Sequence, residues 1–208
     1  MNRSELKGSY INMALIAANV IFFFFLTAQG RTEYDMELML RYGACYEPLI
    51  VYEHQYWRLF TACFMHFGMA HLVNNMLVLF ALGDPVEREL GHLPYLVIYL
   101  LSGIGGNIFS AWYNLRIGEI AISAGASGAV FGVMGMLLWM VMRRGGTFSG
   151  MSLNRLIASI ALSIYLGMSE GGVDVAAHVG GLICGFVLCI LLYRPERKRR
   201  THTEWDLM

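Results

Sequence analysis

The chain is divided by stretches that contain no charged residue. Six stretches of this kind cover residues 10–30, 66–83, 93–115, 120–142, 156–169 and 175–193. A helix of roughly 20 apolar residues crosses the apolar core of a bilayer, so the pattern predicts six membrane-spanning helices. Hydropathy supports two of them least, because the fifth stretch is short and the second contains His71, Asn74 and Asn75.

Composition agrees with a membrane protein. Hydrophobic residues make up 57% of the 208 residues and charged residues only 14%, whereas a soluble domain carries about 25% charged residues. The mean hydropathy is +0.53. We therefore predict an all-α, polytopic membrane protein whose single membrane domain covers residues 10–193 and includes a long outer loop, 31–65. A short N-terminal segment, 1–9, precedes this domain, and a basic tail, 194–208, follows it.

The distribution of positive charge predicts the orientation. If the N-terminus lies in the cytoplasm, the Lys and Arg residues on the outer side are Arg31, Arg41, Arg58 and Arg116, out of 15 in the chain. This bias follows the positive-inside rule, so both termini are expected in the cytoplasm. We expect the membrane to be a bacterial inner (plasma) membrane.

The two ends of the chain are interpreted in the same way. The first apolar stretch is longer than the roughly 7–15 apolar residues of a signal peptide, so a membrane span is favoured over a cleaved leader. The basic tail is interpreted as the flank of the last span, with attraction to anionic lipid as an alternative. A net charge of 0 gives no indication of nucleic-acid binding.

A serine lies in a small-residue tetrapeptide, Gly125-Ala126-Ser127-Gly128, at the start of an apolar run. Backbone N–H groups in the first turn of a helix are unpaired and point the same way, which suits a developing oxyanion. The glycines leave room for a substrate backbone. Taken alone, the tetrapeptide fits an N-cap serine with packing glycines better. It is not the hydrolase elbow G-x-S-x-G, because residue 129 is Ala.

A histidine in the last stretch strengthens the interpretation of this serine. His178, Gly181 and Gly185 share one face of a helix. The fourth stretch carries a matching small-residue stripe, formed by Gly128, Gly132 and Gly135. Two such faces pack backbone to backbone in membranes, which would bring His178 to Ser127. A structural histidine or a proton relay is the alternative, and the paired glycine faces favour catalysis.

The second stretch contributes a third polar group. His71 and Asn75 are four residues apart, so both project from one helix face and both could donate hydrogen bonds to an oxyanion. A zinc site formed by His66, His71 and His178 is the alternative. It is disfavoured because no carboxylate or thiolate is placed to complete it. We predict no metal and no cofactor, and His66 has no assigned role.

The four cysteines suggest no metal site either. Cys45 and Cys63 lie in or beside the outer loop, where a disulfide is conceivable but weakly supported. Cys184 and Cys189 lie in the last stretch and are interpreted as small apolar side chains.

Together these motifs carry a family resemblance. In chain order they are Trp57-Arg58, His71-Leu-Val-Asn-Asn75, Gly83-x-x-x-Glu87-x-x-x-Gly91, Gly125-Ala-Ser-Gly128 and Ala177-His178-x-x-Gly181-x-x-x-Gly185. Any one of them is weak, but jointly they cover residues 57–185 in the family's order. The chain resembles the minimal six-span form of the rhomboid intramembrane serine proteases.

The resemblance implies a Ser-His dyad. Ser127 would be the nucleophile and His178 the general base, with no acidic third residue. His71, Asn75 and the Ser127 N–H would bind the oxyanion. The implied supporting residues are Phe131, Gly125, Gly128, Gly181 and Gly185. Phe131 stands where many relatives have Tyr, and it keeps the aromatic ring but not the hydroxyl.

The resemblance also implies structural roles and a substrate class. Trp57 and Arg58 would anchor the outer loop, and Glu87 would tie the inner loop by hydrogen bonds. The expected partners are the lipid bilayer and a single-span membrane protein, cleaved in or beside its transmembrane segment. We expect it to enter near the short fifth stretch, 156–169. The sequence indicates no oligomeric state.

Two other classes of protein stay open. A catalytically inactive rhomboid-like chaperone or trafficking factor would share the fold, although such relatives usually lack the serine or the histidine. A small transporter is disfavoured because the chain has no internal repeat and no intramembrane acidic residue apart from Asp174, at the edge of a span.

Overall fold

Six long helices form the body of the protein. The computed structural model describes residues 8–33, 35–170 and 172–193. Within them the six are α1 (Tyr10–Thr27), α5 (Met69–Leu90), α6 (His92–Ile117), α7 (Ser127–Arg143), α8 (Leu153–Glu170) and α9 (Val175–Leu192). Four, α1, α5, α6 and α9, are long and apolar enough to cross a membrane, and α7 and α8 are shorter apolar helices. The predicted all-α membrane bundle is confirmed.

The outside of the bundle is apolar, like its core. Large apolar side chains that are more than half exposed project from α1, α5, α8 and α9: Ile21, Leu77, Phe80, Leu162 and Leu191. Extensive exposed apolar surface of this kind marks contact with a membrane. The chain is an integral, multi-pass membrane protein.

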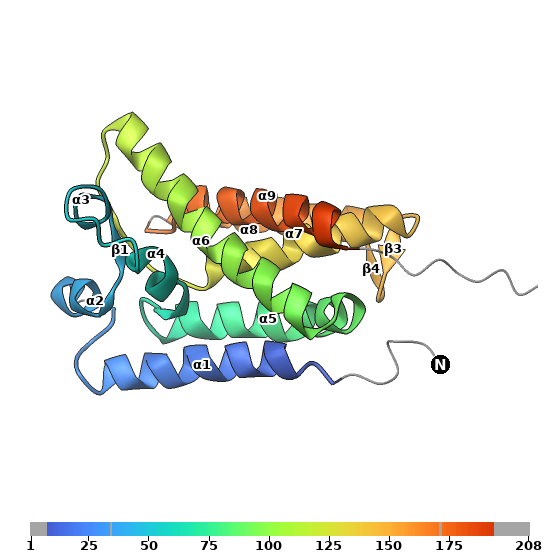
Figure 1. Cartoon of the computed structure of the whole chain (residues 1–208), viewed down its shortest axis with the longest axis horizontal. Helices are drawn as coiled ribbons and strands as arrows, with labels where there is room; N and C mark the ends of the chain where they lie inside the picture. The colour runs from blue at the N-terminus through green and yellow to red at the C-terminus, as the bar shows by residue number, and fades with distance from the viewer. Residues whose placement is uncertain (1–7, 34, 171, 194–208) are drawn as a thin grey trace, which may run out of the picture.

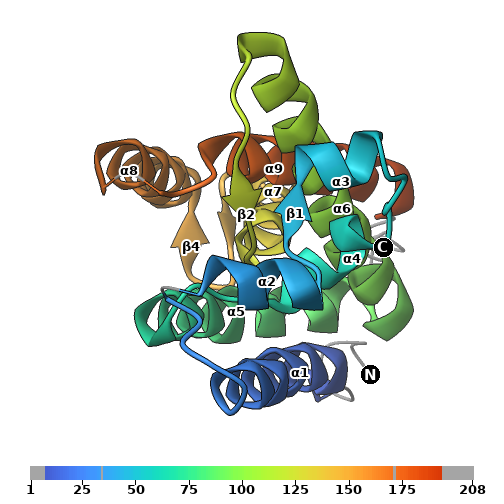
Figure 2. The ribbon, with the colours of Figure 1, turned by 90° about the vertical axis from the view of Figure 1, so that its left-hand side faces the viewer.

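Helix α7 is the centre of the bundle. It lies between α5, α6, α8 and α9, whereas α1 packs on the far side of α5 (Figures 1 and 2). Every residue from 128 to 137 is buried. The α7 helix begins at Ser127, so its first turn faces the same end of the bundle as the short elements that follow α1 (Figure 1). We call this the loop end, and the opposite end the terminal end.

The helix boundaries differ most from the hydropathy pattern at two places. The fourth helix begins at Ser127 rather than at residue 120, because α6 ends at Ile117, its cap residue Gly118 is left-handed (φ 74°) and an extended segment follows. The second helix begins at Met69, after His66, and continues through Pro85 to Leu90 instead of ending at residue 83. Charged side chains ended the apolar stretch there, but they do not end a helix.

The outer loop is a compact set of short elements. They are α2 (Met36–Tyr42), β1 (Cys45–Tyr46), α3 (Glu47–Val51), α4 (Arg58–Thr61) and the 3-10 turn η2 (Ala62–Phe64). Strand β1 pairs antiparallel with β2 (Ile122–Ser123), in the segment that precedes Ser127 (Figure 2). The loop is thereby attached directly to the start of α7. In this structure Cys45 and Cys63 are both free thiols.

Arg58 holds the loop together from inside. Its guanidinium is buried and donates to the backbone carbonyls of Leu40 and Ala44, at 2.7 and 3.0 Å. The guanidinium also lies 4.7 Å from the ring centroid of Trp57, whose side chain is half exposed. An exposed Trp beside a buried Arg suits an element that rests in the membrane interface.

At the terminal end, Glu87 connects three helices. Its buried carboxylate accepts hydrogen bonds from the backbone N–H groups of Ile11 and Asn12, in the first turn of α1, at 3.0 and 2.7 Å. The imidazole of His92, the first residue of α6, also contacts this carboxylate. Glu87 therefore satisfies two N–H groups that a helix start leaves unpaired.

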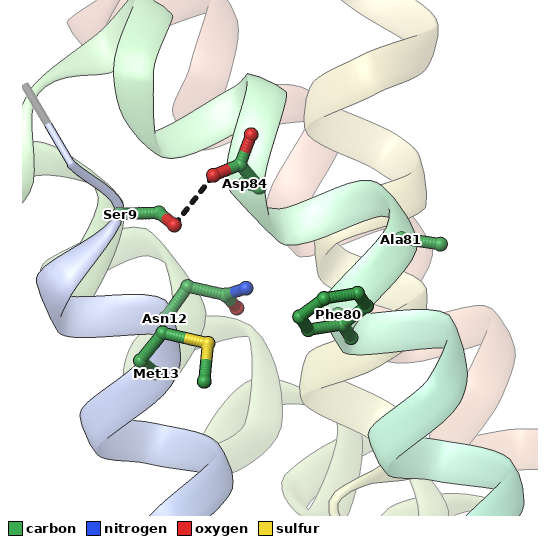
Figure 3. A pocket seen from close by; sticks show the side chains of 6 residues that line it. All are labelled: Ser9, Asn12, Met13, Phe80, Ala81 and Asp84. Atoms are coloured by element: carbon green, nitrogen blue, oxygen red, sulfur yellow. Dashed lines mark hydrogen bonds between the residues drawn. The ribbon is translucent and has the colours of Figure 1, made fainter.

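A pocket lies beside this connection, between α1 and α5. It is lined by Ser9, Asn12, Met13, Phe80, Ala81 and Asp84 (Figure 3). The Ser9 hydroxyl donates to Asp84 across it, at 2.5 Å. The Asn12 side chain donates to the Leu79 carbonyl and accepts from Tyr95.

A second connection at the terminal end joins α5, α7 and α9. Glu89, near the end of α5, accepts from Arg144 at 2.5 Å and from the Tyr193 hydroxyl at 2.6 Å. These two residues follow α7 and α9 directly. A short hairpin of β3 (Thr147–Phe148) and β4 (Met151–Ser152) then leads into α8. Apart from residues 8 and 9, the predicted segments 1–9 and 194–208 lie outside the described residues.

Candidate active site

Ser127 occupies the first position of α7, and the peptide units before it are held from the outer loop. The Gly125 N–H donates to the Ala62 carbonyl at 2.9 Å, and the Ala126 N–H donates to Nε2 of His66 at 3.4 Å. The next N–H, that of Ser127, has no hydrogen-bond partner among the described residues. A free N–H beside the serine hydroxyl is the arrangement that an oxyanion site requires.

Helices α7 and α9 touch through their backbones. A Cβ added at Gly181 would overlap the carbonyl oxygen of Gly128, and one added at Gly185 would overlap that of Gly132. The predicted glycine faces are therefore in contact. This contact sets His178, at the loop end of α9, beside the first turns of α7.

His178 packs on Phe131, one turn after Ser127. The two rings are stacked, with centroids 4.3 Å apart and planes 11° apart. The imidazole is buried, with 7% of its residue surface exposed. Its Nδ1 atom has no hydrogen-bond partner in the described part of the chain, so no acid orients the ring.

The acidic residue that precedes α9, Asp174, has another role. Asp174 caps this helix, since its carboxylate accepts from the Ala177 N–H at 2.8 Å and from the Ser110 hydroxyl at 2.7 Å. Ser127 and His178 form no hydrogen bond with each other among the described residues. Catalytic hydrogen bonds are often long without substrate and tighten in the complex.

His71, on α5, lies against Gly125, and Asn75 follows one turn later on the same helix. The position that a Cβ on Gly125 would take is 2.8 Å from Cε1 of His71 and 3.3 Å from the Ser127 hydroxyl oxygen. Gly125 thus separates these two side chains and leaves no space for a larger residue. The amide nitrogen of Asn75 is buried and has no partner within the described ranges, so it is a free hydrogen-bond donor.

Not every residue of the predicted set lies at this place. Gly125 and Phe131 do, and Gly128, Gly181 and Gly185 lie in the α7–α9 contact beside it. Trp57 and Arg58 belong to the outer loop, and Glu87 lies at the terminal end. Among the described residues no group of three His, Cys, Asp or Glu side chains is placed to hold a metal ion. The zinc alternative built on His66, His71 and His178 finds no support.

The sequence did not indicate two contacts that the structure adds to the site. His66 binds the Ala126 N–H, and Asn107 donates from α6 to the Leu59 carbonyl at 2.8 Å. Neither has a local pattern, because each depends on how the outer loop folds back onto the bundle. Asp174, three residues before the N–H that it caps, does show the usual N-cap spacing.

Comparison with known proteins identifies the family. The Rhomboid domain family matches residues 53–195. The chain belongs to the rhomboid family. This rhomboid is 35% identical over 181 residues to "Rhomboid protease GluP" of Bacillus subtilis, covering 87% of the chain and 34% of that relative.

Plant relatives also match this rhomboid. "RHOMBOID-like protein 1" of Arabidopsis thaliana is 36% identical over 157 residues, covering 74% of the chain and 39% of the relative. "RHOMBOID-like protein 4" of the same plant is 41% identical over 143 residues, covering 67% and 35%. The chain spans roughly a third of the length of these relatives. The predicted resemblance to the family is confirmed.

Proposed function

We propose that this rhomboid is an intramembrane serine endopeptidase that cleaves single-span membrane proteins in or beside their transmembrane segments. Ser127 acts as the nucleophile and His178 as the general base. The observation that carries the proposal is the backbone contact of α7 with α9 combined with the Phe131–His178 stack. It brings an imidazole with a free nitrogen to the start of the helix that carries the serine.

The reaction follows acyl-transfer chemistry. Neutral His178 accepts the hydroxyl proton of Ser127 while the serine oxygen attacks the peptide carbonyl carbon. The tetrahedral intermediate carries a negative oxygen, which accepts hydrogen bonds from the Ser127 N–H, His71 and Asn75. As the C–N bond breaks, protonated His178 gives its proton to the leaving amine. Water then attacks the acyl-enzyme with His178 as base, which releases the new carboxyl group and restores Ser127.

The free donors at the site supply most of the expected rate enhancement. The Ser127 N–H and the Asn75 amide nitrogen have no partner within the described residues, so the oxyanion displaces no existing protein contact. Each such donor typically contributes about 2.7–4 kcal/mol to transition-state stabilisation. Phe131 takes over the positioning of the imidazole, a task that an aspartate performs in a triad.

The substrate reaches the site from the membrane between α5 and α8. Helix α8 has few contacts with the bundle, and Leu162, Tyr165 and Met168 on it are largely exposed. With the loop end outside and both termini in the cytoplasm of a bacterial cell, cleavage occurs near the outer face of the inner membrane. A cross-link between α5 and α8 that leaves cleavage intact would disprove this route.

Labelling with a fluorophosphonate probe tests the proposed function. The purified protein in detergent should be labelled, whereas Ser127→Ala and His178→Ala variants of unchanged thermal stability should not. A reporter with a single transmembrane segment should be cleaved by the wild type alone. Equal labelling of all three proteins, or none of a folded wild type, would indicate the inactive rhomboid-like class instead.

A further inference from the structure

His66 is the most deeply buried ionisable side chain near the candidate site that the proposed reaction does not use. It lies in the loop between η2 and α5, before the first residue of the membrane span, and it is 0% exposed. A buried polar side chain is costly unless its partners repay the lost hydration. The contacts of this imidazole therefore indicate its role.

The first contact of His66 is with the backbone beside the serine. Nε2 lies 3.4 Å from the Ala126 nitrogen, as a hydrogen-bond acceptor. An imidazole nitrogen accepts only without its proton, so the ring is neutral and its single proton is on Nδ1. Burial, with the neighbouring His71 adding to it, lowers the pKa of His66 to about 3. The ring is therefore neutral throughout the physiological range of pH.

The second contact of His66 is with a candidate oxyanion donor. Its ring meets the His71 ring edge to face, with centroids 5.1 Å apart and planes 75° apart. His71 in turn lies against Gly125, where there is no space for a side chain. One buried ring thus contacts both sides of the site: the peptide that precedes Ser127 and the imidazole of His71.

We propose that His66 is a positioning residue. Its Nε2 holds the Ala126 peptide and its ring supports His71. As a result, the Ser127 N–H and the His71 imidazole stay directed at the same point. This inference deepens the proposed function and rests on it. His66 touches no reacting atom, so its loss leaves the nucleophile and the base in place. Misplacement of catalytic groups by about 1 Å can reduce a rate about 100-fold.

Two substitutions separate the hydrogen bond from the packing. His66→Phe keeps an aromatic edge against His71 but removes the acceptor. His66→Gln loses the ring but can place an amide oxygen near the position of Nε2. Tyr95→Phe is the matched control, because Tyr95 is equally buried and loses its hydrogen bond to Asn12 far from the site.

Kinetics and labelling form the first part of the test. We expect His66→Phe to lower kcat for the reporter about 10- to 100-fold with KM nearly unchanged, and His66→Gln to recover part of that loss. Tyr95→Phe should reduce thermal stability and leave kcat unchanged. If His66→Phe lowers kcat no more than Tyr95→Phe does at an equal loss of stability, the positioning role is wrong.

Amide exchange and ring nitrogen shifts form the second part, and they do not require activity. In the wild type, 15N NMR should find the His66 proton on Nδ1, and the Ala126 amide should exchange slowly. The Ala126 exchange rate should rise about 10-fold or more in His66→Phe and less in His66→Gln. An Ala126 amide unaffected by both variants would overturn the inference, whether or not the wild type cleaves the reporter. If the wild type does not cleave the reporter but the Ala126 amide behaves as expected, only the proposed function is overturned.

Discussion

The imidazole of His178 lies flat on the ring of Phe131, with the two ring centroids 4.3 Å apart. Phe131 is four residues after Ser127 on the same helix, so the stack fixes the imidazole relative to the serine through one turn of α7. The two residues lie on different helices, and the glycine contact between these helices sets the height of one ring over the other. The geometry of the stack therefore determines how the His178 imidazole is oriented relative to Ser127.

Replacing the flat ring should loosen the base. We expect Phe131→Leu, which keeps an apolar side chain, to lower kcat about 10-fold, because a stacked aromatic pair is worth about 0.5–1.5 kcal/mol. Phe131→Tyr should retain kcat. Reporter cleavage at saturating substrate is the measurement. A Leu variant as active as the wild type would show that another contact orients His178.

A side chain at the helix contact should separate α7 from α9. Gly181→Ala places a methyl group against the Gly128 carbonyl, and overpacking of this kind costs about 1–3 kcal/mol or more. We expect lower thermal stability together with loss of Ser127 labelling. The control is Ile183→Ala on the exposed side of α9, which should change neither. Normal labelling in a stable Gly181→Ala protein would contradict the contact.

Removal of the Asn75 amide should cost activity and little stability. Its nitrogen has no partner in the part of the chain that the structure describes, so Asn75→Ala breaks no hydrogen bond of that nitrogen in the folded protein. We expect kcat to fall about 100- to 1,000-fold, the typical loss for one oxyanion donor. The free energy of unfolding should stay within about 1 kcal/mol of the wild-type value. A large loss of stability with kcat preserved would assign Asn75 a structural role.

Glu87→Ala should show the reverse of Asn75→Ala: a large loss of stability and little loss of activity per folded molecule. The substitution leaves the N–H groups of Ile11 and Asn12 without their carboxylate, and each buried unpaired donor costs about 1–3 kcal/mol. We expect α1 to loosen while the fraction of folded protein still labels at Ser127. Glu37→Ala, which removes an exposed pair with Arg41, should cost less than about 1 kcal/mol. Equal losses of stability in both variants would contradict the role of Glu87 as acceptor for the first turn of α1.

Tyr193 should produce a pH dependence at the terminal end. Burial raises the pKa of Tyr193 to about 12 from its usual 10, so the folded protein keeps this proton where the unfolded chain has lost it. The contribution of protonated Tyr193 to the free energy of unfolding is therefore fully present below pH 10 and is lost as the pH rises toward 12. We expect this part of the decline in stability to be absent in Tyr193→Phe. Identical curves of thermal unfolding against pH would show that Tyr193 does not contribute.

The sequence indicated those parts of the site that depend on local spacing. Glycines four residues apart share a helix face wherever the helix lies, so the contact of Gly128 with Gly181 could be predicted from two short patterns. The beginning of α7 at Ser127 was less accessible, because the apolar stretch continues back to residue 120 through an extended segment that pairs with β1. Hydropathy measures apolarity and does not detect such a pairing.

The remaining contacts depend on folding over long distances in the chain. His66 meets Ala126 only because η2 and the segment before α7 lie side by side. Glu87 was expected to tie an inner loop by hydrogen bonds, and its partners are the first turn of α1 and the first residue of α6. The pairing of an acid with a helix start 75 residues earlier leaves no periodic signal.

The glycine contact also restricts how the two helices can move. Gly128 faces Gly181 and Gly132 faces Gly185, so both helices present bare backbone at the same four-residue interval. Sliding α9 by one residue would bring a side chain such as Leu182 against α7, whereas a slide of a full turn would keep only one of the two pairs. The two helices can therefore pack only in discrete registers. Intermediate positions of His178 along the axis of α7 are not accessible. A motion that admits substrate is therefore expected from elements other than this pair of helices.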